Sequence, residues 1–523
     1  MIATKRDCRQ VVPNNGPARE ALRVKGQFWT PHWLARPMAA WVVAPRPPAL
    51  FDPAVGPGTF FAAAREIGFH GSFSGFELDE LALAESSKLG LNQQDVRGII
   101  TGDFLQHSIA EKYPAIISNP PYIRHHRLSG SQKQELRVLA RKCLGFELDG
   151  RVGLHLYFLL KCLHLLSENG RLAFLLPADV CEGVSSTAFW KRITDHYRLE
   201  AVVSFAQSAA PFPGVDTNAM VFLISNRAPA SSVRWVKIIK PDEDALLGLF
   251  EGTDGNGTSA AEIHHRDLKE ALRTGLSRPP RGNRPAGVPL SAFARVVRGI
   301  ATGANEFFFL TSDQAEALGL DKAYFRRAIG RTRDCPGGEV TKPDLEALDK
   351  SGRPTWLLNL GRQTEDDLPQ PLRDYLKTGT KMGLPSRALI KTRTPWYRME
   401  ERSAPGLLFA YLGRRDCRFI LNLAGVVPLT GFLCVYPWDP STAFCKKLAK
   451  ALNHPETLAN LSFIGKSYGG GAVKVEPRQL DTLEIPQHVL DEIGLKSPPS
   501  LTQMALLDAP GHRTTRSGQK PRR

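Results

Sequence analysis

An asparagine, two prolines and a tyrosine stand directly after a short apolar segment, in the stretch AIISNPPY that ends at Tyr122. Prolines cannot donate to a sheet ladder, so the pair Pro120 and Pro121 ends a strand and stiffens the backbone that follows. By itself the pattern is typical of a tight exit from a strand. It also places the side-chain amide of Asn119 at the carboxyl end of that strand, where open α/β sheets hold their ligands.

Three earlier apolar segments end in acidic residues. ALFD ends at Asp52, SFSGFE ends at Glu77 and RGIITGD ends at Asp103. A carboxylate at such a strand end can accept hydrogen bonds from ribose hydroxyls or from an adenine amino group, and Phe104 offers a ring that can pack on a base. Each acid alone is typical of an exposed strand end. Together with Asn119, however, the three acids predict one ligand crevice.

A glycine turn follows the first of these acids, in the stretch DPAVGPGTFFAAARE. Gly56 and Gly58 stand between a strand and a helix, where glycines let a ligand approach the backbone and the helix start offers free N–H groups. The dinucleotide-binding fingerprint GxGxxG is incomplete, because Phe61 occupies the third glycine position. The turn alone is weak evidence for a nucleotide ligand.

In order and spacing, the segments DPAVGPGTF, FELD, GDFL and NPPY resemble those of the S-adenosylmethionine-dependent DNA adenine-N6 methyltransferases. The match is to the gamma-class (TaqI-like) arrangement of type II restriction-modification systems. The resemblance implies that S-adenosyl-L-methionine lies in the crevice and that KGQFWTPHWL closes over its methionine end. The residues that it assigns to cofactor binding are Gln27, Phe28, Thr30, Pro31, Asp52, Gly56, Gly58, Glu77, Asp103 and Phe104.

The resemblance also gives NPPY a chemical role. The exocyclic amine of adenine is a poor nucleophile, because its lone pair is delocalised into the ring. The side-chain carbonyl of Asn119 and the backbone carbonyl of Pro120 would accept hydrogen bonds from that amine and aim its lone pair at the sulfonium methyl, on a loop stiffened by Pro121. Tyr122 would stack on the base. Phe212, in the later segment FPGVDTN, is either a second stacking residue or a core aromatic.

Segments of the second half resemble the target-recognition regions of the same enzymes. VVRGIATGANEFFFL predicts a strand–loop–strand, and both LIKTRTPWYR and SYGGGAVKVEP interleave basic residues with glycines and aromatics, as suits phosphate contact. The alternative is that Trp396 and Tyr397 are core residues. The predicted DNA-contacting residues are Arg298, Thr302, Asn305, Lys391, Arg393, Trp396, Tyr468 and Lys474.

Composition and charge are consistent with this interpretation. Apolar residues make up 42% of the chain and charged residues 23%, as in soluble globular proteins. The net charge of +16 favours a polyanionic partner. No apolar run is long enough to span a bilayer, and the first residues carry no signal-type segment. The eight cysteines form no CxxC pair, so we expect reduced cysteines, no metal site and a cytoplasmic protein.

The length of 523 residues predicts two or three domains. Residues 1–235 alternate short apolar strands with helical stretches, which predicts an α/β domain. The resemblance implies that this domain is a class I methyltransferase with a Rossmann-like sheet. Residues 236–289 are rich in Gly and Pro and predict a linker or surface excursion, in which His264 and His265 are solvated. Residues 290–490 predict a mixed α+β target-recognition domain, and residues 491–523 a basic, disordered tail.

Other enzymes share the NPPY motif, among them methyltransferases that act on RNA amines or on glutamine amides of proteins. They fit less well, because such enzymes usually carry extra domains ahead of the glycine turn and lack a basic domain behind the catalytic one. A methylating subunit of a larger restriction or phage-defence complex is a further alternative. We find no nuclease segment of PD…ExK type with room for a fold before Gly26. The expected partners are double-stranded DNA, at a site that analogy suggests is TCGA-centred, and a separate cognate endonuclease. The chain is expected to be a monomer.

Overall fold

The chain folds into two compact units. The computed structural model describes residues 26–496, apart from 124, 126–127, 146–147, 149–151, 182–185, 213–214, 216–217, 252–258, 281–286, 411–416 and 468–472. Unit 1 runs to Asn283 and also takes in Lys466–Lys474, whereas unit 2 comprises Arg284–Gly465 and the chain from Val475 onward. Each unit is described by itself.

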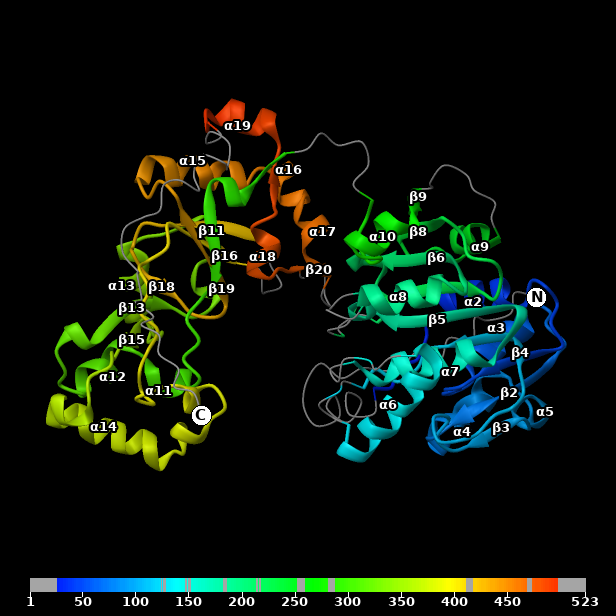
Figure 1. Ribbon diagram of the computed structural model, residues 1–523. Coiled ribbons are helices and arrows are strands. Elements are labelled where there is room, and N and C mark those ends of the chain that lie inside the picture. Colours follow the sequence, from blue (N-terminus) through cyan, green and yellow to red (C-terminus); the bar gives the residue numbers. More distant parts are fainter. Residues whose placement is uncertain are drawn as a thin grey trace, which may run out of the picture. The chain divides into compact units, whose positions relative to one another are not determined.

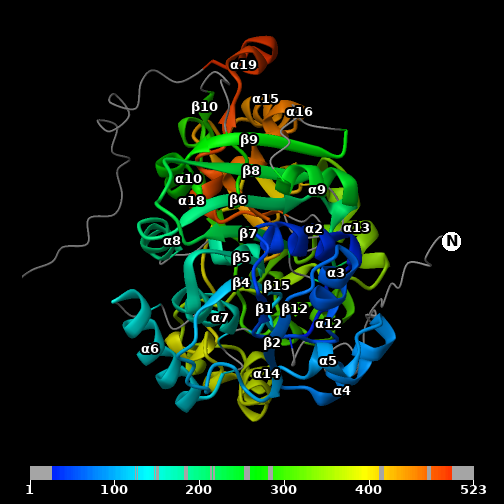
Figure 2. The same ribbon diagram turned by 90° about the vertical axis from the view of Figure 1, so that its right-hand side faces the viewer.

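Unit 1 is built on a nine-stranded sheet in the order β3-β2-β1-β4-β5-β7-β6-β8-β9 (Figures 1 and 2). Strands β1 to β5 run parallel, and β7 is antiparallel to both of its neighbours. Seven apolar segments of the sequence predict strands of this sheet, and all seven contain one: ALFDP, GSFSGFE, RGIITGD, AIISNPP, GRLAFLLP, EAVVSF and AMVFLIS. The strands are β1 (Ala49–Asp52), β2 (Ser72–Glu77), β3 (Ile99–Thr101), β4 (Tyr113–Ser118), β5 (Leu166–Pro177), β6 (Arg198–Phe205), β7 (Ala219–Ser225), β8 (Ser232–Ile238) and β9 (Ala261–Asp267).

Helices cover both faces of this sheet, as an α/β sandwich requires. One core contains apolar residues of α2 (His32–Val43), α3 (Thr59–Glu66) and α9 (Glu243–Glu251). The opposite core contains residues of α6 (Gly130–Leu144), α7 (Leu154–Leu165), α8 (Ser186–Thr194) and α10 (Leu268–Thr274). The central strand β7 is buried along its whole length, since both of its faces are covered. The short helices α4 (Glu80–Ala84) and α5 (Gln93–Val96) follow β2.

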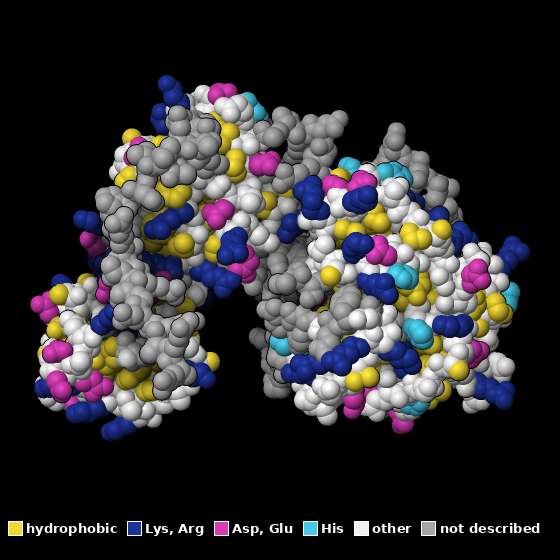
Figure 3. Space-filling model, in the orientation of Figure 1, with side chains coloured by type: hydrophobic (Ala, Val, Ile, Leu, Met, Phe, Trp, Pro, Cys, Tyr) yellow, Lys and Arg dark blue, Asp and Glu magenta, His cyan; other side chains and the backbone are white. Residues whose placement is uncertain are grey.

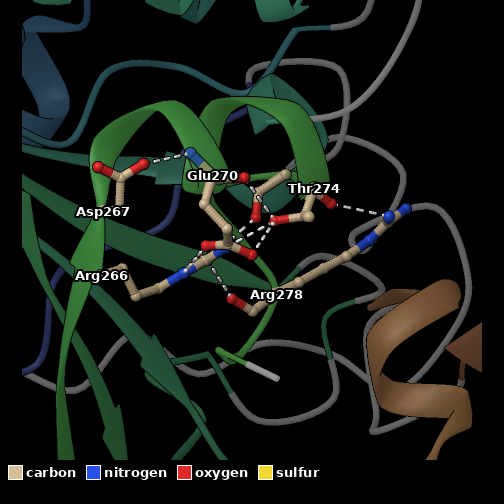
Figure 4. A network of polar contacts seen from close by, with 6 residues as sticks. Arg266, Asp267, Glu270, Thr274 and Arg278 are labelled. Carbon is tan, nitrogen blue, oxygen red and sulfur yellow. Dashed lines mark hydrogen bonds and ion pairs between the residues drawn. The ribbon is translucent and has the colours of Figure 1, made fainter. Parts of the chain in front are cut away.

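The structure corrects the predicted linker at residues 236–289. Strand β8 crosses residue 235, and β9 pairs with β8 over seven residues, so this stretch completes the sheet. The buried guanidinium of Arg266, on β9, donates to the Glu270 carboxylate at 2.7 Å, to the Thr274 hydroxyl and to the carbonyl of Arg278 at 2.6 Å (Figure 4). These contacts hold α10 on the sheet. His264 and His265 are exposed on β9, as predicted.

Unit 2 contains two main sheets. One has five strands in the order β11-β19-β16-β17-β14, and the other has four strands in the order β12-β15-β13-β18. The strands of the first sheet are β11 (Ala294–Arg298), β14 (Glu339–Val340), β16 (Leu407–Ala410), β17 (Arg418–Asn422) and β19 (Phe432–Pro437). Those of the second are β12 (Phe309–Leu310), β13 (Phe325–Ile329), β15 (Trp356–Leu358) and β18 (Val427–Pro428).

Helices pack around these sheets and give unit 2 its mixed α and β character. They are α11 (Asn305–Phe308), α12 (Ser312–Ala317), α13 (Lys342–Lys350), α14 (Gln370–Lys381), α15 (Thr442–Leu452), α16 (Pro455–Ala459), α17 (Leu461–Ile464), α18 (Pro477–Leu480) and α19 (Gln487–Ile493). A further ladder of unit 2 pairs β10 (Val288–Pro289) with β22 (Glu484–Ile485). The ladder of β20 (Lys466–Ser467) with β21 (Val473–Lys474) lies in the segment that belongs to unit 1. Because α19 ends at Ile493, the tail predicted from residue 491 begins within a helix, and its remainder after 496 lies outside the described residues.

Three observations concern the described part of the chain. None of its helices is long and apolar enough to cross a membrane. Its His, Cys, Asp and Glu side chains form no group of three that would suit a metal ion, and its cysteines are unbridged.

Candidate active site and cofactor pocket

A pocket of about 760 Å³ opens at the carboxyl ends of the first four strands of unit 1. Its wall combines segments that lie far apart in the sequence: the stretch 26–30, the glycine turn after β1, the end of β2, the residues after β3, and the NPPY loop after β4. The predicted site residues that line it are Gln27, Phe28, Thr30, Gly56, Glu77, Asp103, Phe104, Asn119 and Pro121. Of the four strand-end residues predicted to share one crevice, Glu77, Asp103 and Asn119 line this pocket and Asp52 does not.

Asp52 does not line the pocket but holds its floor. The carboxylate is 1% exposed, and its Oδ1 accepts from the backbone N–H of Ala54 and from the hydroxyl of Ser118, each at 2.9 Å. Burial raises the pKa of Asp52 to about 7, although both hydrogen bonds oppose this shift. The residue thereby ties the glycine turn to the end of β4, one position before Asn119.

Glu77 lines the pocket and is hydrogen-bonded to the glycine turn. Its Oε2 accepts from the Gly56 N–H at 2.6 Å, and its Oε1 accepts from the Asp79 N–H at 2.7 Å. Burial raises its pKa, which these backbone hydrogen bonds counteract. Gly56 has φ +58°, and a Cβ there would meet no atom within 4 Å, so its missing side chain leaves open space beside the turn.

Asp103 ends the neighbouring wall of the pocket, and a buried lysine supports its turn. Asp103 Oδ1 accepts from the Leu105 N–H at 2.9 Å. Lys161, which interrupts the apolar helix α7, donates to the carbonyl oxygens of Phe104 and His107 and lies 4.5 Å from the centre of the Phe104 ring. Phe104 is 1% exposed and packs in the core. It lines the pocket, but little of its ring is open to a ligand. The sequence analysis missed Lys161, for which the signal was a cation within an apolar helix.

Asn119 is oriented by the upstream segment. Its Nδ2 donates to the backbone carbonyl of Phe28 at 2.6 Å and to the Thr30 hydroxyl at 3.2 Å. A carbonyl oxygen can only accept, so the NH2 end of the amide is held against the segment 28–30. The Oδ1 end then remains as the acceptor on a residue that lines the pocket.

The segment 26–31 and the NPPY loop also meet through their backbones. The N–H of Tyr122 donates to the carbonyl of Gly26 at 3.0 Å. Gly26 has φ +63°, and a Cβ at this position would lie 2.7 Å from the nitrogen of Tyr122. Only glycine satisfies both constraints, and the sequence analysis did not single it out. Pro31 begins α2 as its N-cap residue and does not line the pocket.

Aromatic rings gather beside the NPPY loop. The ring of Tyr122 lies 6.1 Å from that of Phe28, 6.4 Å from that of Phe212 and 5.9 Å from that of His155. Phe28 and Phe212 are themselves 5.7 Å apart. Phe212 is 7% exposed, so it is a largely buried aromatic that stands next to the reactive loop. Phe212 is therefore a core aromatic, and its stacking on a base stays a prediction.

His155 is a further residue of this cluster that the sequence analysis missed. It is 4% exposed at the start of α7, and burial lowers its pKa. The Nδ1 of His155 and the hydroxyl of Tyr122 are buried without a hydrogen-bond partner among the described residues. Its ring fills the space beside Gly153, where a Cβ would lie 2.3 Å from Cε1. The only sequence signal was a lone histidine entering an apolar helix.

Four further predicted site residues do not line the pocket, namely Gly58, Pro120, Tyr122 and Phe212. Gly58 has φ +84° as the N-cap residue of α3, and a Cβ there would lie 2.6 Å from Leu91 Cδ1. Its role is to form the turn.

In unit 2 one hydrogen bond joins two of the segments that hold predicted DNA-contacting residues. The Nη2 of Arg393 donates to the carbonyl of Ala301 at 2.6 Å, which joins the segment 391–393 to the loop after β11. Arg298, at the end of that strand, is exposed and paired with Glu476. Asn305 and Lys391 are exposed as well.

Other predicted DNA contacts have structural roles or are not described. Thr302 is 2% exposed, because its hydroxyl accepts from the Ala304 N–H and donates to the Asn305 side chain. Trp396 packs 5.9 Å from Phe307 in the core of unit 2, as the alternative for this residue held. Tyr468 lies outside the described residues, and Lys474 is described only by its backbone, in β21.

The order β3-β2-β1-β4-β5-β7-β6 with a reversed β7 defines a class I methyltransferase, a fold that uses S-adenosylmethionine. Comparison with family models agrees. The Eco57I restriction-modification methylase model matches residues 79–212, and the model of the C-terminal domain of type II methyltransferase M.Eco57I matches residues 283–504.

Individual relatives extend over most of the chain. Type II methyltransferase M.AccI of Acinetobacter calcoaceticus is 26% identical over 413 residues, which cover 78% of this chain and 75% of the relative. Type II methyltransferase M.XamI of Xanthomonas campestris pv. amaranthicola is 25% identical over 474 residues, covering 88% and 85%. The type IIL restriction-modification enzyme MmeI, solved in complex with DNA, has a similar fold at 14% identity, with a TM-score of 0.50 over 93% of this chain and 74% of MmeI. Over most of its length the chain is therefore similar to type II methyltransferases of restriction-modification systems.

Proposed function

We propose that this chain transfers the methyl group of S-adenosylmethionine to the N6 amine of an adenine that is turned out of duplex DNA at a specific short site. The observation that carries the proposal is the orientation of Asn119, whose amide is held by the Phe28 carbonyl so that Oδ1 is left as an acceptor at the pocket. M.AccI and M.XamI, both type II methyltransferases, support the DNA part of the proposal.

The pocket suits a nucleoside-bearing cofactor in size and chemistry. Its volume of about 760 Å³ is in the range of small-molecule sites. Glu77 and Asp103 offer carboxylate oxygens for ribose hydroxyls and for an adenine amine, and Phe28 and Thr30 line the end nearest Asn119. When bound, the cofactor supplies an electrophilic methyl group, which N6 accepts while S-adenosylhomocysteine and a proton are released.

Asn119 and Pro120 activate the amine by accepting its hydrogen bonds. Two acceptors on the N–H groups favour a pyramidal nitrogen whose lone pair is no longer delocalised into the ring. The nitrogen becomes acidic only after it is methylated, so no general base is needed before attack. The buried Asp52 keeps the two prolines in place, through the end of β4, rather than exchanging protons with substrate.

The aromatic cluster receives the base. Turning a nucleotide out of a duplex costs a few kcal/mol, which stacking on rings helps to offset. Tyr122 would stack on the adenine, with Phe212 on its other side, next to Phe28. Unit 2 would supply DNA contacts through Arg298, Asn305, Lys391 and Arg393.

The biological setting is part of the same proposal. Motif order is that of the gamma-class (TaqI-like) enzymes, with cofactor motifs first and the target-recognition unit last. Methylation would protect host DNA from a separate cognate endonuclease, and a TCGA-centred target follows from analogy with TaqI-like enzymes. A monomer suffices to modify each strand in turn.

The test is to express the protein in a host without its own adenine methylation and to sequence plasmid DNA by a method that detects N6-methyladenine. One short motif modified at nearly every occurrence is expected, and Asn119→Ala should abolish it. Asn92→Ala, which removes an asparagine that caps the short helix α5 and does not line the pocket, is the matched control and should leave modification intact. Unmodified DNA from folded protein that binds S-adenosylmethionine would contradict the proposal.

A further inference from the structure

Basic residues are concentrated on α6, the helix that follows the NPPY loop. Glu135 is its single acid. By contrast α9, on the other face of the sheet, carries acids and no base. The basic residues of α6 are Lys133, Arg137, Arg141 and Lys142. The charge of unit 1 is therefore not spread evenly over its helices.

Three of these basic residues form a stripe. Lys133, Arg137 and Arg141 recur at every fourth position, so they lie on one side of the helix. Leu136 and Ala140 pack into the core on the adjoining side of the helix, so Lys133 is half-buried while Arg137 and Arg141 are exposed. Eight residues of α-helix rise about 12 Å, and phosphates follow one another at about 3.4 Å along the axis of a DNA strand. The stripe is therefore long enough to meet several phosphates.

The helix begins at the pocket. Leu128 and Gln132 line the same cavity as Asn119, and the hydroxyl of Ser129 caps the first turn by accepting from the Gln132 N–H. In Figure 3, Lys and Arg side chains gather over the part of unit 1 where Figure 1 shows α6. DNA whose base reaches Asn119 must pass its backbone close to the first turns of this helix.

We infer that the outer side of α6 is a DNA-contacting surface of the catalytic unit, on which Lys133, Arg137 and Arg141 bind successive phosphates next to the base that is turned out. The inference rests on the proposed function and extends it, because it places part of the DNA affinity outside the target-recognition unit. The exposed Val138 lies beside the stripe and offers apolar contact to the sugar edge.

The test uses the full chain and a fluorescein-labelled duplex of mixed sequence, about three helical turns long, titrated by anisotropy at several salt concentrations. The double variant Arg137→Gln/Arg141→Gln is expected to bind the duplex about 10-fold more weakly, with a salt slope lower by about 2, since each phosphate contact contributes about 0.9. Its affinity for S-adenosylhomocysteine and its thermal unfolding midpoint should equal those of the wild type.

Two further double variants distinguish phosphate contact by α6 from a general effect of net charge on DNA binding. Lys269→Gln/Arg273→Gln removes an exposed basic pair of the same spacing from α10, at the β9 end of the sheet, and should leave affinity and slope unchanged. Arg137→Lys/Arg141→Lys keeps the charges and should retain the wild-type slope. Wild-type binding by the α6 glutamine variant, or an equal loss in the α10 variant, would overturn the inference alone. A wild-type protein that binds no duplex would overturn the proposed function itself.

Discussion

A single carbonyl oxygen decides which end of the Asn119 amide faces the pocket. Because the oxygen of Phe28 can only accept, it selects the NH2 group of Asn119, and the acceptor end is left for substrate. A carboxylate at position 119 would place one of its oxygens against the carbonyl oxygen of Phe28. Both atoms only accept hydrogen bonds, so the contact would be repulsive. The upstream segment therefore belongs to the proposed reactive site, although it precedes NPPY by about 90 residues.

Gly26 sets the position of that segment, and a pair of glycines tests its role. Gly26→Ala is expected to lower kcat by at least about 10-fold, because the new Cβ would lie 2.7 Å from the nitrogen of Tyr122 and displace the reactive loop. Gly68→Ala is the control, since Gly68 has a similar positive φ but open space around it. The added Cβ strains a backbone of positive φ in both variants. Equal activity of the two in methyl-transfer assays would show that the position of Gly26 against the NPPY loop does not matter.

Asp52 makes the stability of unit 1 depend on pH. Its pKa is about 7 in the folded protein and 3.8 in the unfolded chain, so the folded state binds more protons between these values. The contribution to stability is complete below about pH 4 and is lost as the pH rises through 7, up to about 4 kcal/mol.

Asp52→Asn isolates this effect, because the amide oxygen can still accept from Ala54 and Ser118. The variant should gain stability over the wild type as the pH rises from about 4 to 8, measured by urea unfolding at each pH. A difference that stays constant across this range would show that Asp52 titrates normally.

At the scale of elements, the sequence predicts the strands that are strongly apolar. It does not predict a strand that is held in the sheet mainly by contacts with distant residues. Strands β1 to β7 were predicted because each lies in an apolar segment between turn signals, and β1, β4 and β7 are largely buried. Strand β9, AEIHHRD, has only two positions fully buried, and its surroundings are rich in glycine, so its composition is typical of a linker. In the site, strand ends were predictable, whereas Gly26, Lys161 and His155 act through partners distant in the sequence.

Arg266 explains how the polar strand β9 and the helix that follows it are held together. Arg266→Ala would leave the Glu270 carboxylate and two backbone carbonyls without their buried donor. The variant should destabilise unit 1 by about 2–4 kcal/mol, less than the loss of a fully buried ion pair would, because Glu270 is partly exposed. Thermal unfolding measures the change. Glu262→Ala, at an exposed position of the same strand, should shift the midpoint little. Equal shifts in the two variants would show that the network adds no stability.

At the scale of the whole molecule, two sets of cores imply two unfolding events. Unit 1 has a core on each face of its sheet, and unit 2 has separate cores around its own sheets. The candidate cofactor pocket is formed by unit 1 residues alone. A ligand that binds a folded unit stabilises that unit by mass action.

Differential scanning calorimetry of the full chain should therefore show two transitions, of which S-adenosylmethionine raises one. At 100 times the Kd the gain is about 2.7 kcal/mol in the unit that holds the ligand. Glu77→Gln removes a carboxylate that faces the glycine turn and should abolish most of the shift, whereas Glu262→Ala should retain it. Hydrogen exchange in the same samples assigns the shifted transition to unit 1. Protection that rises only in unit 2 would place the cofactor elsewhere and remove Glu77 from its site.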